Sequence, residues 1–330
     1  MSVQGLPVGI AGLGHQVPSR VVDNHYFTRF VDTSDEWIVQ RTGIRERRFA
    51  AEDEATSDLC VHAAEEALRN AGITADELDL IVVGTISPDY QLPSTAVLVQ
   101  DRLGAKKAGA FDVVAACSGF LTALHTGEAF VAAGRARRVL VIGAETLSRF
   151  LNFEDRGSCI IFGDGAGAAV LMPHGECGQG EILSTNLGAD GSGYEFIHMP
   201  GGGTKVPATV ESVEANLHKI ALKGRETFKF AVTRMSRLIR DFMEEHEPDE
   251  LGLIVPHQVN RRIIDAALDR LDMTDEKVVV NIQKYGNTSA ASVPVALHEA
   301  VMEERTVPGK LVVLVAFGAG LTWGGTLIRW

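Results

Sequence analysis

The segment FDVVAACSGFLTAL, residues 111–124, predicts a buried strand that turns directly into a helix at a cysteine. Its first four residues are mostly apolar and β-branched, and Gly119 marks a place of close backbone packing. Cys117 then lies at the start of a helix rich in Ala, Leu and small residues, where free N–H groups and the helix dipole favour a thiolate. Cys117 is therefore a candidate nucleophile, with a buried structural cysteine as the alternative.

Size and composition predict a large α/β protein. A chain of 330 residues exceeds the usual limit of one core, so two domains or a duplicated architecture are expected. Hydrophobic residues make up 45% and charged residues 22%, and the 34 glycines against 11 prolines fit a loop-rich globular chain better than a disordered one.

Charge, cysteine usage and hydropathy predict the partners and the compartment. The net charge of −12 argues against nucleic acid, which needs a basic face. The four cysteines form no CxxC pair, which predicts free thiols in a reducing compartment, with the cytoplasm as the default. The N-terminal segment lacks the features of a signal peptide, and the longest apolar stretch, residues 311–321, is too short to span a bilayer, so no membrane is expected as a partner.

The chain contains an internal repeat with an offset of 173 residues. DELDLIV at residues 76–82 recurs as DELGLIV at residues 249–255. The same offset relates residues 123–125 to 296–298 and the strand-like segment 139–142 to 312–315. Three matches in one register indicate duplicated halves, which we place at residues 1–173 and 174–330.

Each half alternates helical periods with apolar strands, which predicts mostly parallel sheets covered by helices. The first half opens with a strand at residues 8–13, an amphipathic helix at residues 57–71 that stops at Gly72, and a strand at residues 80–84. The strands are apolar on both faces, and the helix after Cys117 is apolar nearly all round. The expected architecture is therefore five layers, αβαβα, with a buried central pair of helices.

Two further candidates come from the second half. The repeat aligns Gly84 with His257, which places His257 at the carboxyl end of a buried strand, where ligand sites of α/β sheets gather. Asn287 is expected near the start of the second central helix, because the offset puts Ala290 opposite Cys117. A satisfied core histidine and an ordinary turn asparagine are the alternatives. A two-fold pairing of the halves brings Cys117, His257 and Asn287 to one pocket, and this convergence favours catalysis.

Motifs for bound cofactors are missing from the sequence. Gly12-Leu13-Gly14 lacks the third glycine of a dinucleotide fingerprint, and residues 201–205 lack the spacing of a phosphate loop. Neither HExxH nor GxSxG occurs. No cofactor and no metal are therefore expected.

Seven motifs together resemble the β-ketoacyl-[acyl-carrier-protein] synthase III family of the thiolase-like superfamily, over essentially the whole chain. They are DEWIVQRTGI, AACSGF around Cys117, DRGSCIIFGDGAGA from Asp155, GRETFKFAV from Gly224, PHQVN around His257, YGNTSAAS around Asn287 and the closing FGAGLTWG. The resemblance implies an acyltransferase with the thiolase-like five-layer fold. Its reaction condenses a short acyl-CoA primer, acetyl or branched, with malonyl-acyl-carrier protein, releases CoA and CO2, and starts type II fatty acid synthesis. CoA thioesters are then substrates rather than cofactors.

The same resemblance implies roles for the candidate catalytic residues. Cys117 attacks the primer thioester, and the backbone N–H groups of Cys117 and Ala319 hold the developing oxyanion. His257 and Asn287 donate hydrogen bonds to the enolate that forms when the malonyl group loses CO2. The His/Asn pair resembles the CoA-primed synthases, whereas chain-elongating relatives carry two histidines in these roles.

The resemblance also implies binding residues. Those expected to contact CoA, with the tryptophan and the second arginine stacking on its adenine, are Thr33, Trp37, Arg41, Arg156 and Asn260. A local basic patch is expected to attract the acidic carrier protein, formed by Arg225, Lys229 and Arg262. The protein is expected to be a homodimer, in which Leu92 reaches into the primer pocket of the second subunit. Some relatives have a phenylalanine at that position, so leucine is expected to leave room for larger primers.

Three alternative functions fit parts of the sequence. The order Cys, His, Asn also fits a papain-like cysteine protease, but the residues around Cys117 lack that family's Cys-Gly-Ser/Ala-Cys-Trp/Tyr pattern. A non-catalytic subunit on the same fold is a second alternative, and retention of all three candidate catalytic residues argues against it. A condensing enzyme or acyltransferase of secondary metabolism is the third, and the sequence leaves it open.

Overall fold

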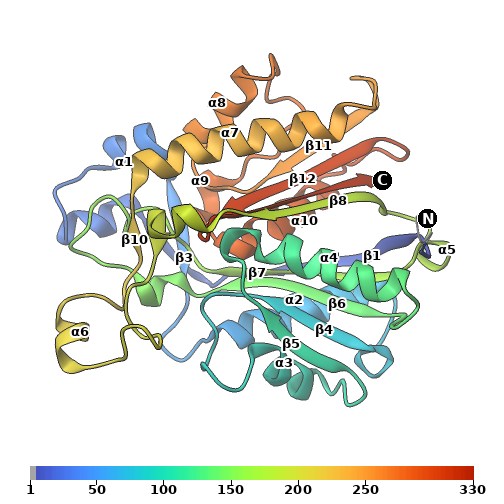
Figure 1. Ribbon diagram of the computed structural model, residues 1–330, viewed down its shortest axis with the longest axis horizontal. Helices are drawn as coiled ribbons and strands as arrows, with labels where there is room; N and C mark the ends of the chain where they lie inside the picture. The colour runs from blue at the N-terminus through green and yellow to red at the C-terminus, as the bar shows by residue number, and fades with distance from the viewer. Residues whose placement is uncertain (1–4) are drawn as a thin grey trace.

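The computed structural model describes residues 5–330, and its centre is a sheet of nine strands (Figure 1). The strands are β1 (Val8–Gln16), β4 (Leu80–Gly84), β5 (Gly109–Val113), β6 (Val139–Glu145), β7 (Gly165–Pro173), β8 (Glu181–Ala189), β11 (Leu251–Pro256), β12 (Leu311–Gly318) and β13 (Thr322–Arg329). They are ordered β11-β12-β13-β8-β1-β7-β6-β4-β5. Strands β1 and β8 are paired through a single pair of residues, Gly9 and Glu181. The sheet therefore consists of two groups of strands that meet along a short seam.

Helices cover both outer faces and fill the space between the two strand groups. They are α2 (Thr56–Ala71), α3 (Thr95–Leu103), α4 (Gly119–Ala132), α7 (Gly224–Met243), α8 (Arg261–Asp269) and α10 (Ser292–Met302). Helix α2 packs on β1 and β7, and α7 packs on β12. The central helices α4 and α10 each contact strands of both groups. The predicted five-layer αβαβα architecture is confirmed (Figure 1).

Short elements decorate these layers. They are β2 (Arg20–Asp23), α1 (Asp35–Thr42), β3 (Glu46–Phe49), α5 (His174–Cys177), β9 (Ile197–His198), α6 (Val210–Glu214), β10 (Ala221–Leu222) and α9 (Ile282–Tyr285). The motif DEWIVQRTGI thus contains α1, a helix of only two turns, and strand β3 follows it. No helix within residues 5–330 has the length and apolar character needed to cross a membrane.

The repeated segments occupy equivalent elements of the two halves. The first match leads into β4 and β11, the second lies on α4 and α10, and the third lies on β6 and β12. The same offset relates Ala116 and Ser289, which precede the two central helices with φ values of 45° and 48°. Both halves therefore enter their central helix through a residue in the left-handed region of backbone conformation, which residues other than glycine rarely adopt. The boundary at residue 173 stays a prediction.

Strand β5 differs from the expectation of a buried strand. It lies at the end of the nine-stranded sheet, and most of its residues are half-buried. Val114, which follows it, is 79% exposed. A terminal strand has a neighbour on one edge only, so a single chain leaves its other edge uncovered.

Close backbone contacts hold the central helices against the strand ends. A Cβ atom at Gly84 would lie 2.4 Å from the carbonyl carbon of Gly119, and one at Gly143 would lie 2.3 Å from the carbonyl oxygen of Ala290. No side chain fits at such distances, so glycine is required at the end of β4 and two residues before the end of β6. These contacts bring the starts of α4 and α10 together.

Candidate active site

A cavity of about 1180 Å3 lies where the two halves meet, and Cys117, His257 and Asn287 all line it. Cys117 comes from the first half, whereas His257 and Asn287 come from the second. Aromatic side chains of the second half, Phe230 and Phe317, line the same cavity. The structure thus brings the three candidate catalytic residues to one apolar pocket.

Cys117 lies in the short 3-10 helix Ala116–Ser118, directly before the first residue of α4. Its side chain is almost entirely buried, and this desolvation raises the pKa of the thiol to about 12. The thiolate predicted from the helix start is therefore wrong for the ligand-free enzyme. Desolvation of a buried negative charge outweighs the attraction of the helix terminus.

His257 directly follows β11 and is fully buried. Its Nδ1 lies 2.5 Å from the Ser292 hydroxyl oxygen, and that oxygen accepts a hydrogen bond from the Gln258 backbone N–H at 3.3 Å. This contact allows the hydroxyl to donate to an unprotonated Nδ1, and in that tautomer the ring proton lies on Nε2. Burial lowers the pKa of His257 to about 3, so the ring is neutral. Nε2 has no hydrogen-bond partner within residues 5–330 and is available to a ligand.

Asn287 is held by its backbone. Its N–H donates to the Ile161 carbonyl at 2.9 Å, and its carbonyl accepts from the Gly163 N–H at 3.0 Å. The side-chain oxygen accepts from the Ser289 N–H at 2.8 Å. Because the oxygen is used in this way, the amide nitrogen is the group left to donate a hydrogen bond to a ligand.

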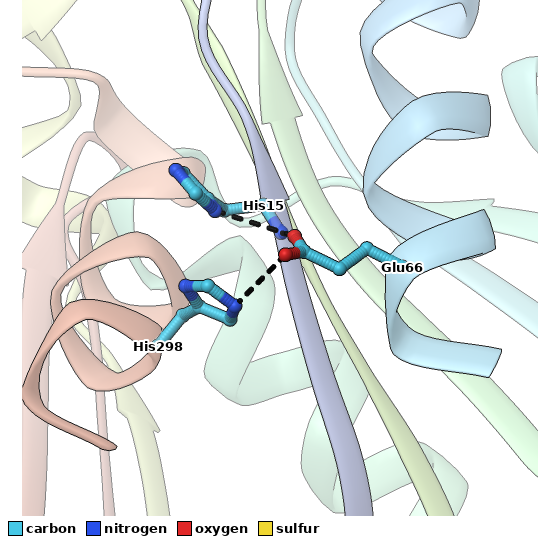
Figure 2. A group of neighbouring side chains, drawn as sticks. All are labelled: His15, Glu66 and His298. Carbon is cyan, nitrogen blue, oxygen red and sulfur yellow. Dashed lines mark hydrogen bonds and ion pairs between the residues drawn. The ribbon is translucent and has the colours of Figure 1, made fainter. Parts of the chain in front are cut away.

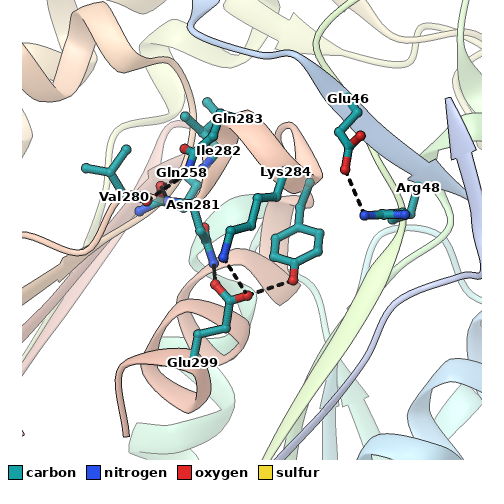
Figure 3. Close-up of polar contacts among 10 residues, drawn as sticks. Glu46, Arg48, Gln258, Val280, Asn281, Ile282, Gln283, Lys284 and Glu299 are labelled. Carbon is teal, nitrogen blue, oxygen red and sulfur yellow. Dashed lines mark hydrogen bonds and ion pairs between the residues drawn. The ribbon is translucent and has the colours of Figure 1, made fainter. Parts of the chain in front are cut away.

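Gln258, the neighbour of His257, has a structural role. Its fully buried side chain donates to the carbonyls of Pro256 and Val279 and accepts from the N–H groups of Asn281 and Ile282. Figure 3 shows this residue beside the start of α9, where the Asn281 amide donates to Glu299 of α10 at 2.7 Å. These bonds join the end of β11 to α9 and α10, and so fix the segments that carry His257 and Asn287.

The predicted oxyanion donors lie beside each other. A Cβ atom at Gly318 would lie 2.7 Å from the Cys117 nitrogen, so the end of β12 touches the nucleophile. Ala319 follows Gly318 and also lines the cavity. Neither the Cys117 nor the Ala319 N–H donates to a loop or turn carbonyl in the described part of the chain. The Thr322 hydroxyl links the two segments that carry these N–H groups, because it lies 3.0 Å from the Ala115 carbonyl oxygen and 2.9 Å from the Ala319 carbonyl oxygen.

Trp37 and Arg156 line the cavity and contact each other directly. The Arg156 guanidinium lies 4.7 Å from the centre of the Trp37 ring, and that of Arg41 lies 5.4 Å from it. A base stacked between Trp37 and Arg156 needs a separation of roughly 7 Å, twice an ordinary contact distance. The pair must therefore part before it can sandwich an adenine.

The other expected CoA contacts are placed differently. Asn260 lines the cavity, caps the start of α8 and donates to the Arg41 carbonyl at 3.1 Å. Thr33 lies outside the cavity lining, and its hydroxyl is buried without a hydrogen-bond partner in the described residues. The structure therefore places four of the five expected residues in the cavity lining, and Thr33 is not among them.

The expected docking residues lie on two neighbouring helices. Arg225 and Lys229 are exposed near the start of α7, and Arg262 is exposed in the first turn of α8 and lines the cavity. Helices α7 and α8 pack against each other. The three cations thus lie on adjoining elements beside the opening of the cavity.

Leu92 is 87% exposed on the loop between β4 and α3. It lines the outer part of the cavity of its own chain, together with Tyr90, which is 61% exposed. Its expected position in a partner's primer pocket stays a prediction.

Glu145, Ser289 and Ser292 were not singled out from the sequence. Glu145 ends β6 and is fully buried, where it accepts hydrogen bonds from Ser87 at 2.6 Å and from Ser289 at 3.1 Å. Burial raises the pKa of its carboxyl to about 7. A carboxylate at the end of the otherwise apolar VLVIGAE strand was the available signal. The two serines needed the tertiary contacts to be recognised.

Comparison with known proteins agrees with this geometry. Residues 111–191 match the family described as 3-oxoacyl-[acyl-carrier-protein (ACP)] synthase III, and residues 243–330 match its C-terminal family. The chain is 51% identical over 326 residues to the β-ketoacyl-[acyl-carrier-protein] synthase III of Symbiobacterium thermophilum, covering 98% of each chain. It is 50% identical over 324 residues to that of Clostridioides difficile, again covering 98% of each.

Solved structures show the same likeness. The 3-oxoacyl-[acyl-carrier-protein] synthase III of Aquifex aeolicus superposes with a TM-score of 0.90 at 46% identity, covering 98% of this chain and 100% of that one. A priming β-ketosynthase of a polyketide pathway superposes with a TM-score of 0.89 at 34% identity, covering 99% and 97%. The chain belongs to the β-ketoacyl-[acyl-carrier-protein] synthase III family.

Proposed function

We propose that this enzyme condenses a short acyl-CoA with malonyl-acyl-carrier protein and releases CoA and CO2, giving the 3-oxoacyl-carrier protein that starts fatty acid synthesis. The observation that carries the proposal is the unpaired Nε2 of the neutral, buried His257 in the cavity that also holds Cys117 and Asn287. A neutral hydrogen-bond donor in an apolar pocket suits an enolate oxygen.

In the first half-reaction, the Cys117 sulfur attacks the carbonyl carbon of the acyl-CoA thioester. The Cys117 and Ala319 N–H groups stabilise the oxyanion, and the bond to the CoA sulfur then breaks. The thiol proton leaves with CoA as its free thiol, so acyl-Cys117 and CoA are the products. Burial raises the pKa of the Cys117 thiol, so we expect this proton to depart during acylation rather than before it.

In the second half-reaction, malonyl-carrier protein loses CO2 and the electron pair of the broken C–C bond forms an enolate. His257 Nε2–H and the Asn287 amide donate hydrogen bonds to its oxygen. The enolate carbon attacks the carbonyl carbon of acyl-Cys117, and the cysteine sulfur leaves and regains a proton. The apolar walls, including Phe230 and Phe317, exclude water that would otherwise compete with these hydrogen bonds.

A role in secondary metabolism is the second candidate. The likeness to the priming β-ketosynthase of a polyketide pathway supports it, since the two chains superpose over nearly their whole length. The chemistry at Cys117 is the same in both cases. The two candidates differ in which acyl-CoA is used and in which carrier protein accepts the product.

We also infer a homodimer that works in the cytoplasm. The free edge of β5 and three strongly exposed apolar side chains near it, Tyr90, Leu92 and Val114, support self-association. The four cysteines are free thiols, which suits a reducing compartment. Light scattering of the wild type and of Val114→Asp tests the dimer, and an unchanged mass for that variant would contradict the interface.

The function is tested by incubating the pure enzyme with a panel of acyl-CoAs and malonyl-carrier protein and identifying the products by mass spectrometry. We expect 3-oxoacyl-carrier protein from short primers. Transfer of the acyl group without loss of CO2 would point to an acyltransferase instead.

A further inference from the structure

Three side chains meet outside the active-site cavity, near the end of β1 (Figure 2). His15 lies on β1, Glu66 on the outer helix α2 and His298 on the central helix α10. One ligand atom of each lies within 4.8 Å of those of the other two. Nδ1 of His15 and Nε2 of His298 each lie 3.3 Å from a different oxygen of the Glu66 carboxylate.

His298 is the member whose polar atoms are least satisfied. It is 4% exposed, and neither ring nitrogen has a hydrogen-bond partner within residues 5–330, because the 3.3 Å contact with Glu66 lacks hydrogen-bond geometry. Its ring lies 4.4 Å from that of His15. A buried polar atom without a partner is costly and calls for an explanation.

The position of the cluster in the fold explains part of it. Beyond its contact with β8 at Gly9, one edge of β1 is left without a strand partner. Glu66 accepts a hydrogen bond from the His15 backbone N–H at 2.7 Å, and Asn70 donates to the Leu13 carbonyl at 2.7 Å. Helix α2 therefore covers this edge with polar side chains. That role needs Glu66, but it needs neither imidazole.

We propose that His15, Glu66 and His298 bind a divalent transition-metal ion, Zn2+ being the best match, and that the ion fastens α2 and α10 to β1 where the strand groups part. Two imidazoles and a carboxylate form a known set of zinc ligands, with water in the fourth position. His15 and Glu66 side chains are each 28% exposed, which leaves a path for the ion and room for that water. This site adds a metal to a protein for which the family resemblance implies none.

The geometry requires only a small adjustment. Ligand atoms about 2.1 Å from a tetrahedral ion lie roughly 3.4 Å apart. The widest separation in the cluster, within 4.8 Å, therefore has to close by at most about 1.4 Å. The partly exposed His15 and Glu66 side chains are the members of the cluster with room to rotate.

Zinc binding by the full-length, untagged enzyme tests the proposal. Cys117 is first alkylated with iodoacetamide so that its thiol takes up no metal, and the protein is stripped with a chelator, incubated with Zn2+ and dialysed. We expect about one zinc ion per chain by elemental mass spectrometry and a higher melting temperature with zinc than without. Cobalt in place of zinc is expected to give ligand-field bands without a sulfur charge-transfer band, since no thiol is a ligand.

Two variants and a control identify the ligands. His298→Ala and His15→Ala are expected to lose the bound zinc and the zinc-dependent rise in melting temperature. His15→Ala is the second variant in case the buried substitution His298→Ala prevents folding, because the His15 side chain is partly exposed. His246→Ala removes a histidine that pairs with a single carboxylate, Glu250, at 3.4 Å, and is expected to bind zinc like the wild type. Failure of the wild type to retain zinc, or equal retention by His298→Ala and the wild type, overturns the proposal.

Discussion

Replacing Ser292 with alanine is expected to slow decarboxylation. Without the Ser292 hydroxyl, the ring proton of His257 is no longer confined to Nε2 and can lie on Nδ1 instead. We expect the Ser292 hydroxyl, which lies 2.5 Å from Nδ1, to donate to that nitrogen in the tautomer that carries the ring proton on Nε2, while its oxygen accepts from the Gln258 N–H. Without the hydroxyl, Nδ1 loses its only partner in a fully buried ring. Tautomers with the proton on Nδ1 then become accessible, and these cannot donate to an enolate at Nε2.

The size of the effect follows from the burial of both groups. A neutral hydrogen bond contributes about 0.5 to 1.5 kcal/mol, and leaving a buried acceptor unpaired costs about 1 to 3 kcal/mol. Because His257 is 0% and Ser292 2% exposed, water cannot replace the lost donor and the upper range applies. A loss of about 1 to 3 kcal/mol corresponds to roughly 5- to 150-fold slower decarboxylation.

Single-turnover release of CO2 from malonyl-carrier protein measures this step, and the mass of acyl-Cys117 measures acylation separately. Nitrogen-15 NMR of the His257 ring, assigned by difference against His257→Gln, reports the tautomer directly. Ser236→Ala is the matched control, because Ser236 is a buried helical serine that bonds to the carbonyl of Val232 on its own helix, away from the cavity. The reasoning is refuted if Ser292→Ala releases CO2 at the wild-type rate or if acylation falls by the same factor.

Three further predictions follow from other parts of the structure. Burial raises the pKa of Glu145 from 4.5 to about 7, so between these pH values the folded protein holds a proton that the unfolded chain has lost. The stability that this proton contributes therefore falls as the pH rises from 4.5 to about 7. The stability of the wild type relative to Glu145→Gln should therefore fall by about 2 kcal/mol between pH 5 and pH 7 in urea unfolding, and parallel curves would contradict this. Arg262→Glu should raise the KM for malonyl-carrier protein by about 10-fold at low salt while sparing acylation, and a salt-independent KM would exclude the basic patch. Leu92→Phe should lower kcat/KM for isobutyryl-CoA relative to acetyl-CoA by about 10-fold, and unchanged primer ratios would show that other residues set the pocket.

Much of the architecture was predictable because the two halves repeat one pattern. The offset that aligned Gly84 with His257 placed the histidine at the end of β11, where the structure has it. Apolar strands such as β4 and β12 are buried throughout, as their composition predicts. Local sequence carries these features because they depend on periodicity and on strand ends.

Features that depend on distant contacts were not predictable. The pKa of Cys117 is raised by burial in the assembled core, whereas the local sequence shows only a helix start. Ser292 reaches His257 across 35 positions of the chain. The exposure of β5 likewise reflects its place at the end of the sheet, which the letters FDVV do not reveal.

The identity of the nucleophile is tested most directly by intact and peptide mass spectrometry after incubation with acetyl-CoA. We predict one acetyl group on the peptide that contains Cys117, in the wild type and also in His257→Ala and Asn287→Ala, while both variants fail to release CO2 from malonyl-carrier protein. An acetyl group on Cys60, Cys159 or Cys177 in place of Cys117 would contradict the account.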